Sequence, residues 1–121
     1  MHPRKKLLQE FVESLPEART IERNWLDMKC EIKTKGFAYW LEEGEYAANP
    51  VILIKMPLEL RDKHVEADSD AYGVPKIKIH KNWLEVRLNP DPENWDEVMS
   101  WVKNAYVSTA PKELVKKMNQ V

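Results

Sequence analysis

The residues best suited to contact a ligand lie in one segment, Gly73 to Leu88, where basic side chains surround a histidine and a tryptophan. Four bases and one acid give this segment a local formal charge of +3; they are Lys76, Lys78, Lys81, Arg87 and Glu85. Lysine and arginine neutralise phosphates, and aromatic rings stack on bases or wedge between them. This composition is typical of a surface that holds nucleic acid.

Lysine and isoleucine alternate from Lys76 to His80, which predicts an extended strand with one basic face and one inward face. A solvated strand face that maintains solubility is the alternative interpretation, and Trp83 fits edge packing as well as stacking. Lys55, at the end of an earlier predicted strand, is a further candidate for the same surface. The candidate nucleic-acid-binding residues are Lys55, Lys76, Lys78, His80, Lys81, Trp83 and Arg87.

No residue pattern points to catalysis, since none of the serines has the flanking glycines of a nucleophile elbow. The three histidines are widely spaced and lack the close pairing of zinc ligands. Cys30 is the only cysteine, which excludes an intramolecular disulfide, and its alternating context suggests a small buried hydrophobe. We therefore expect neither an enzyme nor a cofactor.

Acidic side chains gather at Glu93, Asp96 and Glu97 and again at Glu42 to Glu45. The first group is explained by the start of a helix, where the dipole favours negative charge. The alternative interpretation is a ridge that handles metal ions.

The chain has 121 residues, a length that predicts one domain spanning residues 1–121. Its 19 basic and 20 acidic residues give a net charge of -1, which excludes a histone-like binder and an acidic tail protein. Only three glycines argue against a Gly-rich phosphate loop. The basic start lacks the apolar run of a signal peptide, and Val51–Ile54 is too short to span a bilayer. We expect a cytoplasmic protein without a membrane partner, either a monomer or a weak homodimer.

Hydrophobic periodicity predicts helices over residues 4–14, 57–66, 92–106 and 111–118. Alternation predicts strands over 26–33, 37–41, 51–55 and 83–88, the last extended by the segment 76–80. Lys35 and Gly36 are expected to form a turn, and Asp91 to cap the third helix with Pro92 as its first residue. The fold class is therefore α+β, an antiparallel sheet with helices on one face in the order α-β-β-β-α-β-α-α.

Short motifs recur along the chain in a familiar order. They are Leu15-Pro16, Gly36-Phe37-Ala38, Ile52–Lys55 with Pro57, His80-Lys81-Asn82-Trp83, Ala105-Tyr106 and Pro111-Lys112. In this order the sequence resembles the MmcQ/YjbR-like family of small bacterial proteins over nearly its whole length. It departs from that pattern where Lys78 or Ile79 replaces a usual asparagine, and where Glu85 replaces a usual threonine.

This resemblance implies a double-wing fold related to the frataxin-like α+β architecture. It also implies DNA binding without enzymatic activity or a cofactor. The alternative is a protein- or small-ligand-binding module that uses an aromatic sheet surface. An exposed Trp83 near Tyr39 and Trp40 would favour that module, whereas a buried Trp83 beside exposed lysines would favour DNA.

Overall fold

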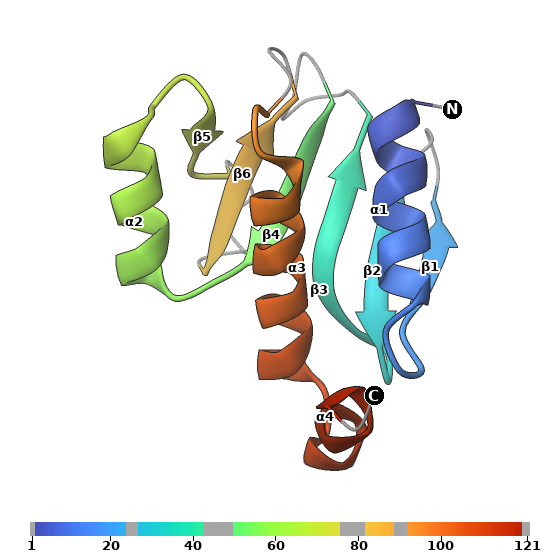
Figure 1. Cartoon of the computed structure of the whole chain (residues 1–121). Helices are drawn as coiled ribbons and strands as arrows, with labels where there is room; N and C mark the ends of the chain where they lie inside the picture. Colours follow the sequence, from blue (N-terminus) through green and yellow to red (C-terminus); the bar gives the residue numbers. More distant parts are fainter. Residues whose placement is uncertain (1, 24–26, 43–49, 76–81, 89–91, 120–121) are drawn as a thin grey trace.

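Six strands pair into a single antiparallel sheet in the order β1-β2-β3-β4-β6-β5 (Figure 1). The computed structural model describes residues 2–23, 27–42, 50–75, 82–88 and 92–119. The strands are β1 (Arg19–Glu22), β2 (Met28–Ile32), β3 (Lys35–Leu41), β4 (Val51–Lys55), β5 (Tyr72–Gly73) and β6 (Trp83–Arg87). The helices are α1 (Pro3–Glu13), α2 (Leu58–Ala67), α3 (Trp95–Thr109) and α4 (Lys112–Asn119). The predicted α+β class is confirmed, with β1 and β5 as additional strands.

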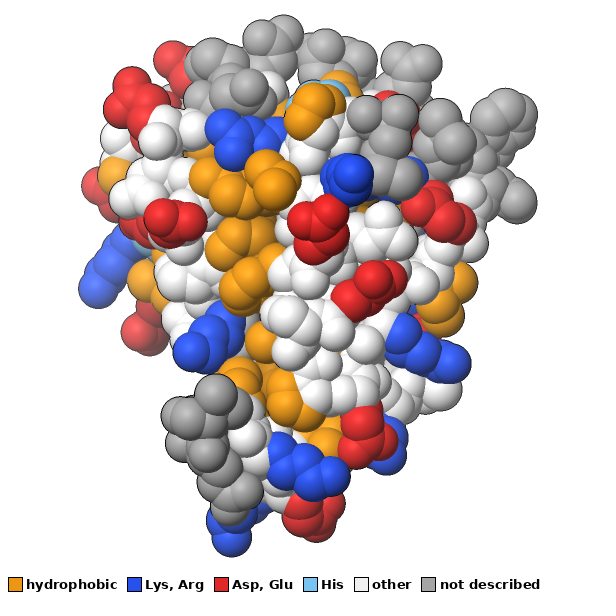
Figure 2. All heavy atoms as spheres, turned by 45° about the vertical axis from the view of Figure 1, so that its right-hand side comes forward, with side chains coloured by type: hydrophobic (Ala, Val, Ile, Leu, Met, Phe, Trp, Pro, Cys, Tyr) orange, Lys and Arg blue, Asp and Glu red, His pale blue; other side chains and the backbone are white. Residues whose placement is uncertain are grey.

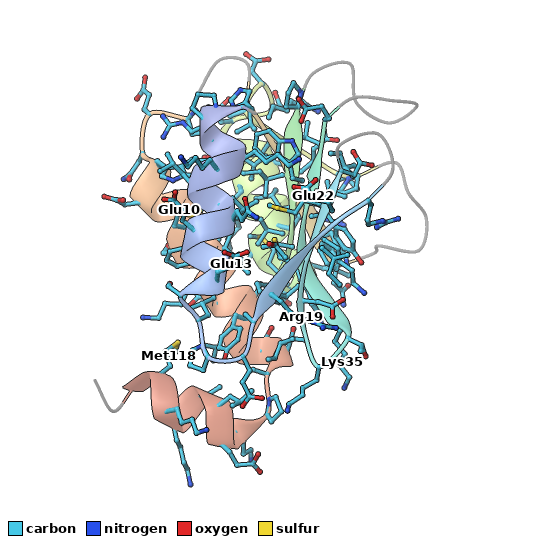
Figure 3. All side chains as sticks on the ribbon, turned by 90° about the vertical axis from the view of Figure 1, so that its right-hand side faces the viewer. Glu10, Glu13, Arg19, Glu22, Lys35 and Met118 are labelled. Carbon is cyan, nitrogen blue, oxygen red and sulfur yellow. The ribbon has the colours of Figure 1, made fainter. Side chains whose placement is uncertain are left out.

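The helices lie on one face of the sheet, where they enclose the main core (Figures 1 and 3). α3 crosses β3 and β4, α1 covers β1, and α2 packs beside β5 and β6. Seen from the β1 edge, α1 and α3 lie on the same side of the strands, and α4 lies beyond one end of the sheet (Figure 3). The opposite face of the sheet carries no described helix and is called the open face below.

The main core contains Cys30, whose side chain is completely buried. Burial, together with the negative charge of Glu13, raises the pKa of the Cys30 thiol to about 12. The thiol is therefore protonated and unreactive in the folded protein, which confirms the interpretation of Cys30 as a small buried hydrophobe.

The β2–β3 hairpin turns at Lys33 and Thr34, both of which have positive φ angles of 50° and 69°. This is a two-residue turn of the type whose twist matches the flanking strands. The prediction of a turn at Lys35 and Gly36 is therefore wrong, because both residues belong to β3. Glycine at position 36 leaves room for a neighbouring side chain, because an added Cβ would lie 2.6 Å from the Tyr39 hydroxyl oxygen.

A β-bulge interrupts the same hairpin. Cys30 pairs with Ala38 and Glu31 pairs with Gly36, so Phe37 is an extra residue between them. Both Phe37 and Ala38 are fully buried as a result, and the Phe37 ring packs edge-on against Tyr106 at a centroid distance of 5.7 Å. The bulge thus anchors β3 to α3.

The start of α3 also differs from the prediction. The helix begins at Trp95 and is capped by Asn94, whose side-chain oxygen accepts a hydrogen bond from the Glu97 amide at 3.0 Å. Asparagine caps a helix as well as aspartate does. Asn94 lies closer than Asp91 to the apolar stripe of the helix, and it is the residue that caps α3. Pro92 consequently precedes the helix.

Candidate nucleic-acid interface

The open face has an apolar centre surrounded by charged side chains. Because side chains alternate along a strand, the residues that face away from the helices fall at every second position. Val51, Leu53 and Trp83 form a small buried cluster there, against which Tyr39 and Leu41 pack. The sheet is therefore packed by apolar side chains on both faces.

Three of the seven predicted site residues lie on this face, and the other four lie outside the described residues. Lys55 ends β4 and pairs with Trp83 across the sheet, while Arg87 ends β6. Alternation within β6 places Arg87 and Trp83 on the same side of the sheet, as the sequence predicts. The residues outside the described part are Lys76, Lys78, His80 and Lys81.

Trp83 is buried, with 8% of its surface exposed. Its ring lies 5.3 Å from that of Tyr39 in a tilted arrangement, a geometry that favours packing between aromatic rings. Tyr39 is half-buried and lies nearer the surface. Tyr39 is therefore the more exposed ring of this pair.

The guanidinium of Arg87 is held in place by several acceptors. Its Nε donates to the Glu85 carboxylate at 3.2 Å, and its Nη1 donates to the Ser69 carbonyl at 2.8 Å. An added Cβ on Gly73 would collide with Nη2, so glycine leaves room for the guanidinium to lie over β5. The Arg87 side chain is still 40% exposed, which leaves a fixed positive charge at this edge of the face.

A second set of charges, on β1 and β2, was not among the predicted site residues. The Glu31 carboxylate accepts a hydrogen bond from Arg19 at 2.7 Å and lies 3.3 Å from the Lys29 amine. The hydrogen bond from Arg19 is the main cause that lowers the pKa of Glu31, and it outweighs the opposing effect of burial. Arg23 continues this basic edge, with its guanidinium carbon 5.7 Å from the centre of the Tyr39 ring.

Positive charge is in excess among the strand residues of the open face. Two carboxylates, Glu31 and Glu85, are each paired with arginine. Four bases on the same strands give a formal excess of two positive charges; they are Arg19, Lys29, Lys55 and Arg87. Alternation along the two strands is the sequence signal for Arg19 and Lys29. Their neighbours Thr20 and Cys30 pair with each other and face the helices, so Arg19 and Lys29 face the opposite way.

The described residues contain no group of three histidine, cysteine, aspartate or glutamate side chains placed to hold a metal ion. Asp96 and Glu97 lie in the first turn of α3, where they stabilise the helix dipole. None of the described helices is both long and apolar enough to cross a membrane. No model of a known protein family matches the chain, and no curated protein matches it.

Proposed function

We propose that this chain is a nucleic-acid-binding protein of the MmcQ/YjbR-like kind, which holds the phosphate backbone of DNA on the open face of its sheet. The observation that carries the proposal is the formal excess of two positive charges among the strand residues of the open face, beside a half-buried Tyr39 that Arg23 approaches. Phosphate contacts of this kind give affinity without sequence readout. The order of the sequence motifs and the α+β architecture support the family assignment.

The burial of Trp83 favours DNA over a protein-binding module. An exposed tryptophan would have been the anchor of a protein interface, because such anchors are aromatic and enter a pocket of the partner. In this chain the ring is buried and packs against Tyr39, while the Arg19 and Arg87 side chains of the same face remain exposed. Lys55 lies beside Trp83, and in the sequence the predicted bases Lys76, Lys78 and Lys81 precede that residue.

The test is fluorescence anisotropy with a labelled duplex across a salt series. Changing Lys76, Lys78 and Lys81 together to glutamate should abolish measurable binding at moderate salt and flatten the salt dependence. The control variant changes Lys112, Lys116 and Lys117 of α4 to glutamate, which alters the net charge equally at another surface. Equal weakening by both variants would show that only net charge matters, and no binding by the unchanged protein at low salt would overturn the proposal.

A single residue within the described part gives a finer test. Lys55→Glu should weaken duplex binding about tenfold and reduce the slope of the salt dependence by about one, because one phosphate contact is lost. Lys63→Glu, an exposed residue of α2, is the matched control and should leave both quantities nearly unchanged. An identical effect of the two substitutions would exclude Lys55 from the contact surface.

A further inference from the structure

A hollow of about 490 Å³ lies between α1 and α3, on the face of the molecule opposite the open face. Its lining is mainly apolar, with Leu7 and Phe11 from α1 and Trp95 and Met99 from α3. Figure 2 shows hydrophobic side chains gathered in a band that runs down this side of the molecule, with acidic and basic side chains along both borders. Exposed apolar surface rimmed by polar residues is typical of a protein–protein contact.

Leu7 differs from the other apolar residues of this hollow because 42% of its surface is exposed. Met99, at the floor, is only 6% exposed. The surface therefore combines a projecting leucine with an adjacent apolar depression. A two-fold axis across such a surface would bring the leucine of each copy to the depression of the other.

The charges on α3 have the symmetry that this arrangement requires. Asp96 and Lys103 both line the hollow and lie seven residues apart, two turns along one side of the helix. If two α3 helices pack antiparallel and cross between Met99 and Ser100, Asp96 of one copy faces Lys103 of the partner subunit. Neither residue forms an ion pair with any residue in the described part of the chain, so both charges are available.

We propose that the α1–α3 hollow is the interface of a two-fold homodimer, in which Leu7 enters the partner's hollow and two symmetric Asp96–Lys103 pairs fix the antiparallel register. The net charge of -1 opposes self-association only weakly. The contact lies on the other side of the sheet from the proposed nucleic-acid surface, so it does not depend on that function.

Sedimentation velocity over a range of protein concentrations tests the proposal. The unchanged protein should shift from the 14.3 kDa monomer toward twice that mass as its concentration rises. Leu7→Gln should weaken dimerisation more than tenfold, because a polar side chain would then enter an apolar depression. Leu58→Gln is the matched control, because Leu58 is 44% exposed on α2 and lies outside this surface. It should leave the dimer unchanged.

A charge exchange tests the register separately. Asp96→Lys alone and Lys103→Asp alone each place like charges opposite one another twice per dimer, and each should weaken dimerisation roughly tenfold. The double variant restores opposite charges at both positions and should recover dimerisation. Mixing the two single variants should also recover dimerisation, because both contacts of a mixed pair then place lysine against aspartate.

Three results would overturn the proposal. The first is a monomer at every concentration of the unchanged protein. The second is a dimer that Leu7→Gln and Leu58→Gln affect equally. The third is a double charge variant no better than the single variants, which would exclude the antiparallel register. Circular dichroism of each variant confirms that it remains folded.

Discussion

Glu31 is a carboxylate that has been taken almost completely out of solvent, since only 3% of its side chain is exposed. It persists in the charged form because Arg19 and Lys29 both compensate it. Removing one partner of a buried ion pair leaves the other charge uncompensated, which is costly. Glu31 therefore links β1 to β2 through a charge whose lowered pKa makes this contribution depend on pH.

The first prediction concerns Glu31→Gln. We expect the free energy of unfolding at pH 7 to fall by about 1–3 kcal/mol, because the charge-assisted bond to Arg19 is lost. Urea denaturation measures this change. Glu17→Gln is the matched control, because Glu17 forms an exposed pair with Lys33 at 3.1 Å and such pairs contribute little. Equal losses from the two substitutions would contradict the assignment.

The pH dependence follows from the lowered pKa of Glu31. A carboxyl whose pKa is lower in the folded than in the unfolded protein stabilises the fold above its usual value, near 4.5. That contribution is lost as the pH falls through the folded value. We expect the unchanged protein to lose stability below about pH 4.5 more steeply than Glu31→Gln, as measured by thermal unfolding at several acidic pH values.

Tyr106 carries the second prediction. Its hydroxyl donates a hydrogen bond of 2.7 Å to the Pro16 carbonyl, which ties α3 to the segment after α1. Tyr106→Phe should lower the free energy of unfolding by about 1 kcal/mol, because the carbonyl loses a partner. Burial, aided by Glu17, also raises the pKa of Tyr106, so its contribution falls as the pH rises above about 10. Alkaline denaturation that is unchanged in Tyr106→Phe would exclude this effect.

Among the elements, the β2–β3 turn offers the third prediction. Thr34 is a β-branched residue with a φ of 69°, a conformation that glycine adopts without strain. Thr34→Gly should therefore increase the free energy of unfolding by about 1 kcal/mol. Thr34→Ala keeps the unfavourable φ and should give a smaller gain. A loss of stability in the glycine variant would show that the turn adopts another conformation in solution.

The elements that could be predicted are those with long or regular hydrophobic patterns. β2, β4 and α3 follow from alternation or from a wide apolar stripe, and each lies close to its predicted range. β1 could not be predicted because only one of its four residues, Ile21, is strongly apolar, so no alternating pattern can be recognised. It is an edge strand fixed by polar contacts with α1, such as Lys5 to Glu22 at 2.9 Å. β5 has only two residues, too few for any period.

In the candidate site, too, the features with a local sequence pattern could be predicted and the others could not. Alternation along β6 was enough to predict that Trp83 and Arg87 share a face. The pairing of Glu31 with Arg19 depends on the register between β1 and β2, which no local pattern contains. The burial of Trp83 likewise depends on Tyr39, which comes from a strand 44 positions earlier in the chain.

At the scale of the whole molecule, the two proposed surfaces lie on opposite sides of one sheet. The fourth prediction is that they act independently. Leu7→Gln should disrupt the dimer while leaving the affinity of one chain for a short duplex unchanged, as anisotropy measures. Lys76, Lys78 and Lys81 changed to glutamate should abolish DNA binding without altering the sedimentation of the free protein. A loss of both properties in either variant would contradict separate surfaces.

Cys30 gives the chain an internal reporter of its own unfolding. The thiol lies between sheet and helices with a pKa of about 12, so a thiol reagent reaches and modifies it only after the layers separate. At neutral pH and high reagent concentration, the labelling rate should equal the rate of global opening. Mass spectrometry of labelled protein would then time the opening of each variant above, without adding a probe.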